Sequence, residues 1–295
     1  MIKLEFPGLD DFLRNALYED IGTGDITTIA CVPESAVSSG KFTAKENGII
    51  SGIDVLVRVF ELLDEAVQVT PLLNDGDNVK AGDVIASVKG RSSAILTGER
   101  TALNLLQHMS GIATRTAEAV LEISGTKAKI LDTRKTTPGL RKLEKYAVLC
   151  GGGTNHRYNL ADGVLIKDNH IKAAGGITNA VKQAQTAIAG KISDKITVGN
   201  KAEQASAIPI EVETESLSQV KEALDAGADI IMLDNMPPEA MSEAVRLISG
   251  RAKTEASGNM GQRDLKTIAE TGVDFISIGA LTHSVKALDI SLKFE

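Results

Sequence analysis

From residue 127 onward, short apolar runs that read as buried strands alternate with helical stretches. The six runs occupy residues 129–132, 163–167, 208–213, 230–234, 252–257 and 275–279. Repeated strand and helix units of this kind predict parallel strands joined by right-handed crossovers. Because six strands are fewer than a closed α/β barrel requires, we expect an α/β fold with an open, incomplete barrel. Residues 191–207 do not fit this alternation of strands and helices well, and the sequence leaves open whether they form a loop or additional structure.

The first part of the chain follows a different pattern. Residues 10–18 predict an amphipathic helix, residues 40–95 alternate short strands with glycine turns, and residues 97–121 return to helical spacing. Residues 75–85 resemble the hammerhead turn of biotinyl and lipoyl domains. Those carriers bear a modified lysine in a following hairpin, whereas an alignment of this chain on that hairpin places Ser92 there. The sequence therefore argues against a carrier role.

Composition and charge exclude several classes of partner. The 295 residues carry a formal net charge of -7, and both nucleic acid and anionic membranes demand a broad basic surface. No apolar run approaches the length of a membrane span, and the first residues lack a charged and then apolar leader, so we expect a cytoplasmic protein. Two cysteines are too few for a disulfide framework or a zinc site. Cys150 precedes a glycine triplet and could be a nucleophile, but a small buried hydrophobic residue is the better interpretation.

Within this acidic chain, basic groups gather in one segment. Residues 132–172 contain eight Lys or Arg against four Asp or Glu. Two of its polar clusters directly follow apolar runs, so their side chains lie at the carboxyl ends of strands, where the chemistry of parallel barrels takes place. Arg, Lys and His at such a rim suit a small ligand with several carboxylates or phosphates, because guanidinium binds either group in a bidentate fork. The alternative is a solvated charged face.

Other strand ends carry acidic or small residues. Glu213 and Asp234 each end an apolar strand, and carboxylates of this sort suit Mg²⁺ held mostly by substrate oxygens and water. They could instead only form salt bridges with the basic cluster. Small residues end the last two strands, where backbone N–H groups can hold a phosphate. They belong to two short runs, Ser257, Gly258, Asn259 and Ser277, Ile278, Gly279, either of which taken alone is more often just a turn.

Taken in order, these motifs resemble those of the quinolinate phosphoribosyltransferase family. The resemblance covers residues 19–284, and its most specific parts are residues 99–104, 132–141, 145–157, 167–170 and 255–259. It implies an N-terminal α/β sandwich domain over residues 1–110, on which residues 282–295 pack, and an α/β barrel catalytic domain over residues 111–281. It also implies a homodimer with shared active sites, Mg²⁺ as cofactor, and quinolinate and phosphoribosyl pyrophosphate as substrates. The implied activity is phosphoribosyl transfer with decarboxylation to nicotinate mononucleotide, in NAD biosynthesis.

The resemblance also assigns roles to particular residues. Arg100 would reach the substrate of the neighbouring subunit, although without the family it would be interpreted as a solvated helix residue. The quinolinate and phosphoribosyl pockets would be lined by Thr133, Arg134, Lys135, His156, Arg157 and Lys167. Glu213 and Asp234 would serve the ribose and Mg²⁺, directly or through water, and would be catalytic together with Lys135 and Lys167. The 5-phosphate would be bound by residues 257–259 and 277–279.

Two other functions stay open at this point. A paralogous phosphoribosyltransferase acting on another ring would keep the phosphate and Mg²⁺ groups but would need fewer cations for carboxylates. A noncatalytic binding protein built on a hammerhead domain would not need the groups at the barrel rim. Five basic residues favour quinolinate, namely Arg100, Arg134, His156, Arg157 and Lys167.

Overall fold

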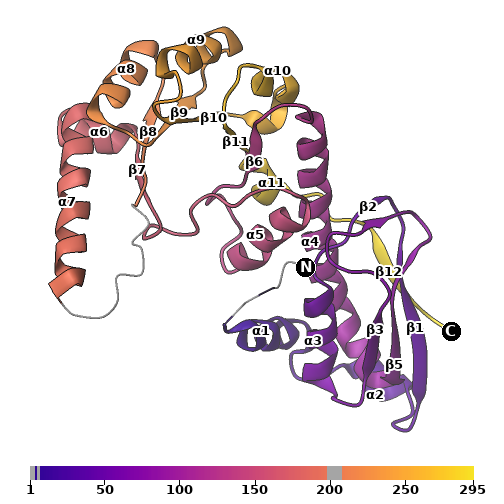
Figure 1. The fold of residues 1–295 in the computed structure, drawn as a ribbon. Coiled ribbons are helices and arrows are strands. Elements are labelled where there is room, and N and C mark those ends of the chain that lie inside the picture. Colours follow the sequence, from indigo (N-terminus) through magenta and orange to yellow (C-terminus); the bar gives the residue numbers. More distant parts are fainter. Residues whose placement is uncertain (1–3, 5–6, 198–207) are drawn as a thin grey trace. The chain divides into compact units, whose positions relative to one another are not determined.

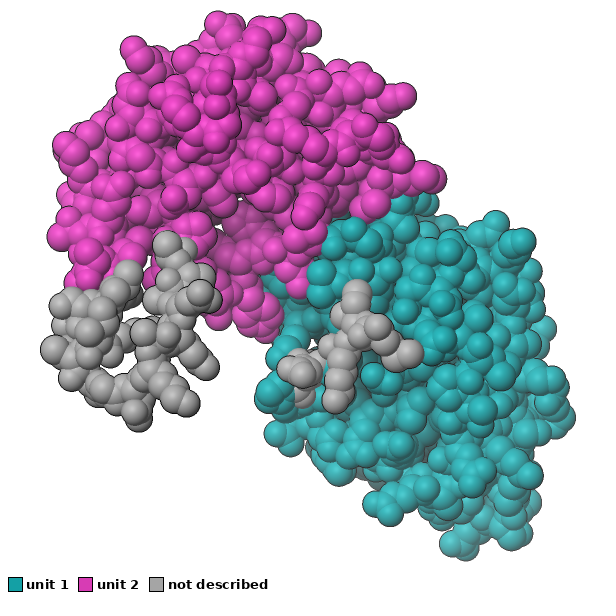
Figure 2. Space-filling model, viewed as in Figure 1, with its two compact units in different colours: residues 1–118, 136–153, 281–295 teal, residues 119–135, 154–280 magenta. Residues whose placement is uncertain are grey.

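The computed structural model describes residues 4, 7–197 and 208–295. Internal contacts divide the chain into two compact units that interleave along the sequence (Figure 2). Unit 1 comprises residues 1–118, 136–153 and 281–295, and unit 2 comprises residues 119–135 and 154–280. The sequence predicts two domains that follow each other along the chain, residues 1–110 and 111–281. In the structure, residues 136–153 instead group with the N-terminal unit. Within the described ranges, no helix is long and apolar enough to cross a membrane.

Unit 1 contains a four-stranded antiparallel sheet in the order β12-β1-β5-β3. Its strands are β1 (Val37–Ala44), β3 (Gln68–Pro71), β5 (Val84–Arg91) and β12 (Ile290–Phe294), and β2 (Gly48–Ile49) and β4 (Asn78–Val79) form a separate pair. In β1 every second residue from Gly40 to Ala44 is buried, which is the alternation of a strand with one covered face. The last strand of the chain, β12, pairs with β1, with Phe42 opposite Leu292. The C-terminus therefore belongs to the N-terminal sheet.

Helices complete unit 1. They are α1 (Leu9–Ile21), α2 (Ile26–Cys31), α3 (Ile53–Leu63), α5 (Arg141–Cys150), most of α4 (Ser92–Glu122) and most of α11 (Ala280–His283). The ring of Phe60 in α3 lies 6.0 Å from that of Phe42 in β1, and both rings are fully buried. Asp75, in the hammerhead-like turn, accepts the backbone N–H groups of Gly52 and Ile53 at the start of α3 and the hydroxyl of Tyr146 in α5. One half-buried carboxylate thus joins this turn to two helices.

The hammerhead-like segment has no carrier hairpin at the expected place. Strand β5 runs to Arg91 and α4 begins at the next residue, Ser92. Ser92 is buried, and its hydroxyl lies 2.6 Å from that of Ser38. A residue that bears a prosthetic group must be exposed, so the structure agrees with the sequence in arguing against a carrier role.

In the described part of unit 2, six parallel strands form one sheet, and each overlaps one of the six runs expected from the sequence. They are β6 (Lys129–Leu131), β7 (Val164–Ile166), β8 (Ile210–Thr214), β9 (Ile230–Asp234), β10 (Lys253–Ser257) and β11 (Phe275–Ser277). Their order is β6-β11-β10-β9-β8-β7, so β6 and β7 are the end strands. Thr154 forms an isolated parallel bridge with Leu131 beside β6. Since β6 and β7 do not pair with each other in the described part of the chain, the expected open, incomplete barrel is confirmed.

Helices lie along the outer side of this sheet (Figure 1). They are α6 (Asp168–Ala174), α7 (Ile177–Thr197), α8 (Leu217–Ala226), α9 (Pro238–Ile248), α10 (Leu265–Glu270) and the short 3-10 helix η1 (Met260–Gln262). Of the stretch that fitted the sequence pattern poorly, residues 191–197 continue α7, and residues 198–207 lie outside the described residues. Because the strands are parallel, all their carboxyl ends face the same edge of the sheet.

Candidate active site

Polar side chains occupy the carboxyl ends of adjacent strands in unit 2. Lys167 follows β7, Glu213 lies near the end of β8, and Asp234 ends β9. In the register between β9 and β10, Asp234 is opposite Ser257. Ser277 ends β11, the next strand of the sheet. The strand ends that the sequence singled out therefore form one continuous rim.

The ammonium of Lys167 forms an ion pair with Glu213 across the neighbouring strands β7 and β8. The side chain of Glu213 is 13% exposed, whereas that of Lys167 is 45% exposed. The backbone N–H of Lys167 donates to Nδ1 of His170 at 3.0 Å, which holds Lys167 at the start of α6. Glu213 thus forms the salt bridge that the sequence left open as an alternative to a metal-binding role. The ammonium of Lys167 is nevertheless still accessible to solvent and to a ligand.

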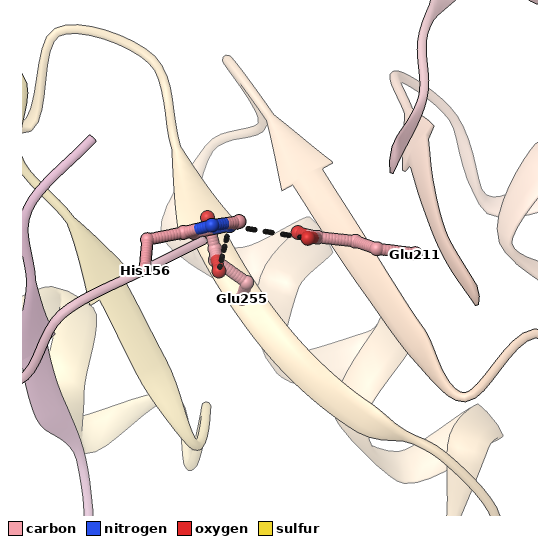
Figure 3. A group of neighbouring side chains, drawn as sticks. All are labelled: His156, Glu211 and Glu255. Atoms are coloured by element: carbon pink, nitrogen blue, oxygen red, sulfur yellow. Dashed lines mark ion pairs between the residues drawn. The ribbon is translucent and has the colours of Figure 1, made fainter. Parts of the chain in front are cut away.

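A second group of charges lies inside the barrel, where His156 stands between Glu211 and Glu255 (Figure 3). Nε2 of His156 is 3.1 Å from Oε2 of Glu211 and 3.5 Å from Oε2 of Glu255. Both carboxylates are at least 95% buried, and each has one oxygen without a hydrogen-bond partner among the described residues. A hydrogen bond of 2.8 Å from the His156 backbone N–H to Asp132, which is fully buried, fixes this segment beside β6.

The hydrogen bonds define which nitrogen of His156 carries a proton. Nδ1 accepts the backbone N–H of Arg157 at 2.7 Å, so the proton of the neutral ring is on Nε2, which faces the two carboxylates. Burial acts to lower the pKa of His156, but the hydrogen bonds to Glu211 and Glu255 outweigh it and raise the pKa to about 10. Burial, and then the charge of Glu255, raise the pKa of Glu211. Because Nδ1 accepts the Arg157 N–H, the additional proton that these raised pKa values imply lies on the side of Nε2 and Glu211.

The same three side chains bring ligand atoms within 4.8 Å of one another, a spacing that a metal ion could use. A histidine that binds metal through Nε2 needs its other nitrogen protonated as a donor. In this structure Nδ1 is an acceptor. We therefore interpret the His156, Glu211 and Glu255 group as a buried proton-sharing cluster and not as a metal site.

A cavity of about 250 Å³ opens beside this cluster. Its polar lining residues are Thr154, Asn155, His156, Arg157, Asp162, Glu211 and Glu255, and its other lining residues are Leu131, Gly163, Val164, Pro209, Ile230 and Phe275. Burial and the nearby charge of Arg134 lower the pKa of Arg157. Arg157 also donates from Nη1 to the backbone oxygen of Gly163 at 3.1 Å. Two of the expected cations, Arg134 and Arg157, are thus close enough to repel each other.

The remaining predicted residues are placed as follows. Thr133 accepts the backbone N–H of Lys135 at 3.0 Å, which shapes the turn after β6. Ser277 donates its hydroxyl to Ala256 at 3.4 Å, and Ile278 donates its backbone N–H to Leu131 at 2.9 Å. Both groups thus take part in holding β11 to its neighbours.

Arg100 and Cys150 belong to unit 1. Arg100 is exposed on α4. Burial raises the pKa of the Cys150 thiol to about 11. Cys150 is only half-buried, but a cysteine nucleophile needs its thiolate, so the raised pKa supports the unreactive interpretation.

Sequence reasoning missed Glu211, Glu255 and Asp132 as partners of His156. The signal for Glu211 was present in β8, because strand side chains alternate and Glu211 and Glu213 lie two residues apart on one face around the fully buried Val212. Nothing in the spacing indicated that Glu255 on β10 meets them.

Comparison with known proteins gives a consistent result along the chain. Residues 25–110 match the N-terminal domain and residues 112–293 the C-terminal domain of quinolinate phosphoribosyl transferase. A probable nicotinate-nucleotide pyrophosphorylase [carboxylating] of Bacillus subtilis is 46% identical over 284 residues, 96% of this chain and 92% of that protein. The nicotinate-nucleotide pyrophosphorylase [carboxylating] of Mycobacterium leprae is 42% identical over 294 residues, 98% of each chain.

Solved structures agree. That of the nicotinate-nucleotide pyrophosphorylase from Francisella tularensis superimposes with a TM-score of 0.88 at 41% identity, over 99% of this chain and 98% of that one. The relatives that share the sequence motifs of this chain thus also share its fold. The chain belongs to the quinolinate phosphoribosyltransferase family.

Proposed function

We propose that this protein transfers the phosphoribosyl group of phosphoribosyl pyrophosphate to the ring nitrogen of quinolinate, with loss of CO₂, in NAD biosynthesis. The observation that carries the proposal is the rim of unit 2, where an exposed cation, Lys167, and a largely covered carboxylate, Glu213, meet at neighbouring strand ends. That rim occurs in a chain whose full-length relatives bear the name of this activity.

Quinolinate carries two carboxylates, and the basic residues near the rim supply the countercharge. Arg134 and Arg157 are close enough for their charges to interact, so a dianion between them would relieve their repulsion and form bidentate hydrogen bonds. Lys135, after β6, and Lys167, after β7, would add cations at the two end strands of the sheet. His156 would form a wall of the pocket, because both of its ring nitrogens are already bonded to protein groups.

Glu213 and Asp234 would act on the ribose. As the C1′–O bond to pyrophosphate breaks, positive charge develops at C1′, and carboxylates beside that carbon lower the barrier. The electron pair of the pyridine nitrogen then forms the new bond to C1′, and fixed placement of the nitrogen supplies much of the remaining rate. The backbone of residues 257–259 and 277–279 would hold the 5-phosphate.

Decarboxylation follows from the charge of the joined ring. The cationic nitrogen stabilises the electron pair left at the neighbouring carbon when its carboxylate departs as CO₂. A proton from the surroundings then fills that position and gives nicotinate mononucleotide. This step needs no redox cofactor.

We propose Mg²⁺ as the cofactor, and the donor set at the rim supports it. Glu213 and Asp234 offer hard carboxylate oxygens on adjacent strands. Mg²⁺ is usually held by one or two carboxylates together with substrate phosphates. When bound, the ion would neutralise the charge that accumulates on the leaving pyrophosphate.

We further propose a homodimer in which Arg100 of one subunit completes the site of the other. A location in the cytoplasm fits substrates whose charges prevent passage through a bilayer. Incubation of the protein with quinolinate, phosphoribosyl pyrophosphate and Mg²⁺ tests the function. We expect nicotinate mononucleotide in the mass spectrum only when all three are present, and consumption of phosphoribosyl pyrophosphate without that product would contradict the proposal.

A further inference from the structure

The adjacent ends of β9 and β10 are each followed by left-handed backbone. The φ angle is +54° at Asn235, +96° at Gly258 and +52° at Asn259. Non-glycine residues seldom adopt this region, although asparagine tolerates it better than most. Strain of this kind persists where the surrounding structure or the function requires it. Asn235 directly follows Asp234, which we have placed at the ribose and Mg²⁺.

Asn235 contacts both strand ends. Its backbone N–H donates to the carbonyl of Ser257 at 3.0 Å, which ties it to the end of β10. Its side-chain Nδ2 donates to Oδ2 of Asp234 at 2.7 Å. The carboxylate of Asp234 is therefore held by a residue that is itself anchored to the neighbouring strand.

Gly258 leaves the space that Asn235 needs. A Cβ atom at Gly258 would lie 2.2 Å from Oδ1 of Asn235 and 2.7 Å from its backbone nitrogen. Any larger residue at this position would have to displace the amide of Asn235. The two turns thus fit together only with glycine at position 258.

We propose that Asn235 is a positioning residue that fixes the carboxylate of Asp234 relative to the turn at residues 257–259, so that both meet one phosphoribosyl pyrophosphate with its divalent ion. This inference rests on the proposed function and adds to it a residue with no direct substrate contact. Outer partners that orient a metal-binding carboxylate typically affect metal affinity or activity by about 10- to 100-fold.

The test uses Asn235→Gly, which keeps the left-handed backbone and removes only the amide. Ser249→Gly is the matched control, because Ser249 is another exposed residue with positive φ in unit 2, at the end of α9. Binding of Mn²⁺ in the presence of phosphoribosyl pyrophosphate is measured by electron paramagnetic resonance, which does not depend on turnover. Quinolinate binding and the melting temperature are measured on the same samples.

We expect Asn235→Gly to weaken Mn²⁺ binding by about 10- to 100-fold, with quinolinate binding and melting temperature close to those of the wild-type protein and of Ser249→Gly. Unchanged Mn²⁺ binding would overturn the inference, and so would equal loss of quinolinate binding, because that would indicate general disruption of the rim. Absence of activity in the wild-type protein would count against the proposed function, and the Mn²⁺ measurement would still decide the role of Asn235.

Gly258→Ala provides a second, independent test. If its added methyl group acts by displacing the Asn235 amide, the substitution should weaken Mn²⁺ binding in the wild-type background more than in the Asn235→Gly background. Such non-additivity is expected of residues in direct contact. Additive effects would mean that the two positions act separately and would overturn the coupling.

Discussion

Nε2 of His156 lies 3.1 Å from a carboxylate oxygen of Glu211 inside the barrel of unit 2. Because its other ring nitrogen, Nδ1, accepts a backbone hydrogen bond, both nitrogens of the imidazole have partners within the protein. A histidine in this position serves as a buried counterpart for acidic side chains. Its charge state should therefore influence stability more than substrate binding.

The first prediction concerns pH and Glu211→Gln. The pKa of His156 is raised from 6.5 to about 10, so the stability it contributes is complete below about pH 6.5 and is lost as pH rises through about 10. The raised pKa of Glu211 acts in the same direction, because its protonated form is favoured in the folded state. Glu211→Gln removes one partner of the imidazole, and we expect the melting temperature to fall less between about pH 7 and 10 than in the wild-type protein.

Glu239→Gln, an exposed change in the first turn of α9, is the matched control and should leave the pH profile unaltered. A wild-type melting temperature that is constant over this range would show that the cluster does not release its proton.

The second prediction separates the two substrates. Arg134→Ala should weaken quinolinate binding by about 2 to 5 kcal/mol, as removal of one partner of a desolvated charge pair does, and should leave phosphoribosyl pyrophosphate binding nearly unchanged. Lys167→Ala should weaken both substrates, because it also releases Glu213. Lys172→Ala, at an exposed lysine on α6, serves as the control. Calorimetric titrations measure each affinity, and equal losses for both substrates in Arg134→Ala would refute this division of the pocket.

How far the sequence predicts this structure depends on the range of the interactions involved. Buried parallel strands are nearly continuous apolar runs, so the six strands of unit 2 and the residues at their ends followed from local pattern. The grouping of residues 136–153 with unit 1 did not. It depends on contacts between distant segments, such as Tyr146 with Asp75 and His108 with Glu144, which no local spacing reveals.

The same distinction applies to the site. Lys167, Glu213 and Asp234 were found because each ends an apolar run. Glu255 lies in the middle of a strand, where an isolated acidic residue only weakens the apolar pattern. Its meeting with Glu211 depends on the strand order, in which β9 separates β8 from β10, and that order is a tertiary property.

The third prediction concerns Asp234→Asn. A neutral amide is a poorer ligand for a hard cation than a carboxylate. Its NH₂ group also cannot accept the hydrogen bond that Asn235 donates to Oδ2 of Asp234. We expect lower activity and a higher Mg²⁺ concentration at half-maximal rate. Asp225→Asn, at an exposed site on α8, should change neither quantity. An unaltered Mg²⁺ titration in Asp234→Asn would remove this residue from the neighbourhood of the ion.

The fourth prediction tests the shared site of the proposed dimer. If Arg100 acts across the interface, mixing inactive Arg100→Ala and Arg134→Ala proteins should restore activity, because each mixed dimer contains one site with both residues intact. Random exchange makes about half of the dimers mixed, so recovery should approach roughly a quarter of wild-type sites. Exchange confirmed by native mass spectrometry without recovered activity would mean that Arg100 acts within its own chain.

The most direct test of the proposed reaction follows the carboxylate carbon itself. Quinolinate labelled with ¹³C at the 2-carboxylate is incubated with the protein and Mg²⁺, with and without phosphoribosyl pyrophosphate, and labelled CO₂ is measured together with nicotinate mononucleotide. We expect both products to form in equal amounts and only with phosphoribosyl pyrophosphate, because the ring nitrogen must become cationic before the carboxylate can leave. Release of labelled CO₂ without phosphoribosyl pyrophosphate, or of a ribosylated product that retains the label, would contradict the proposed reaction.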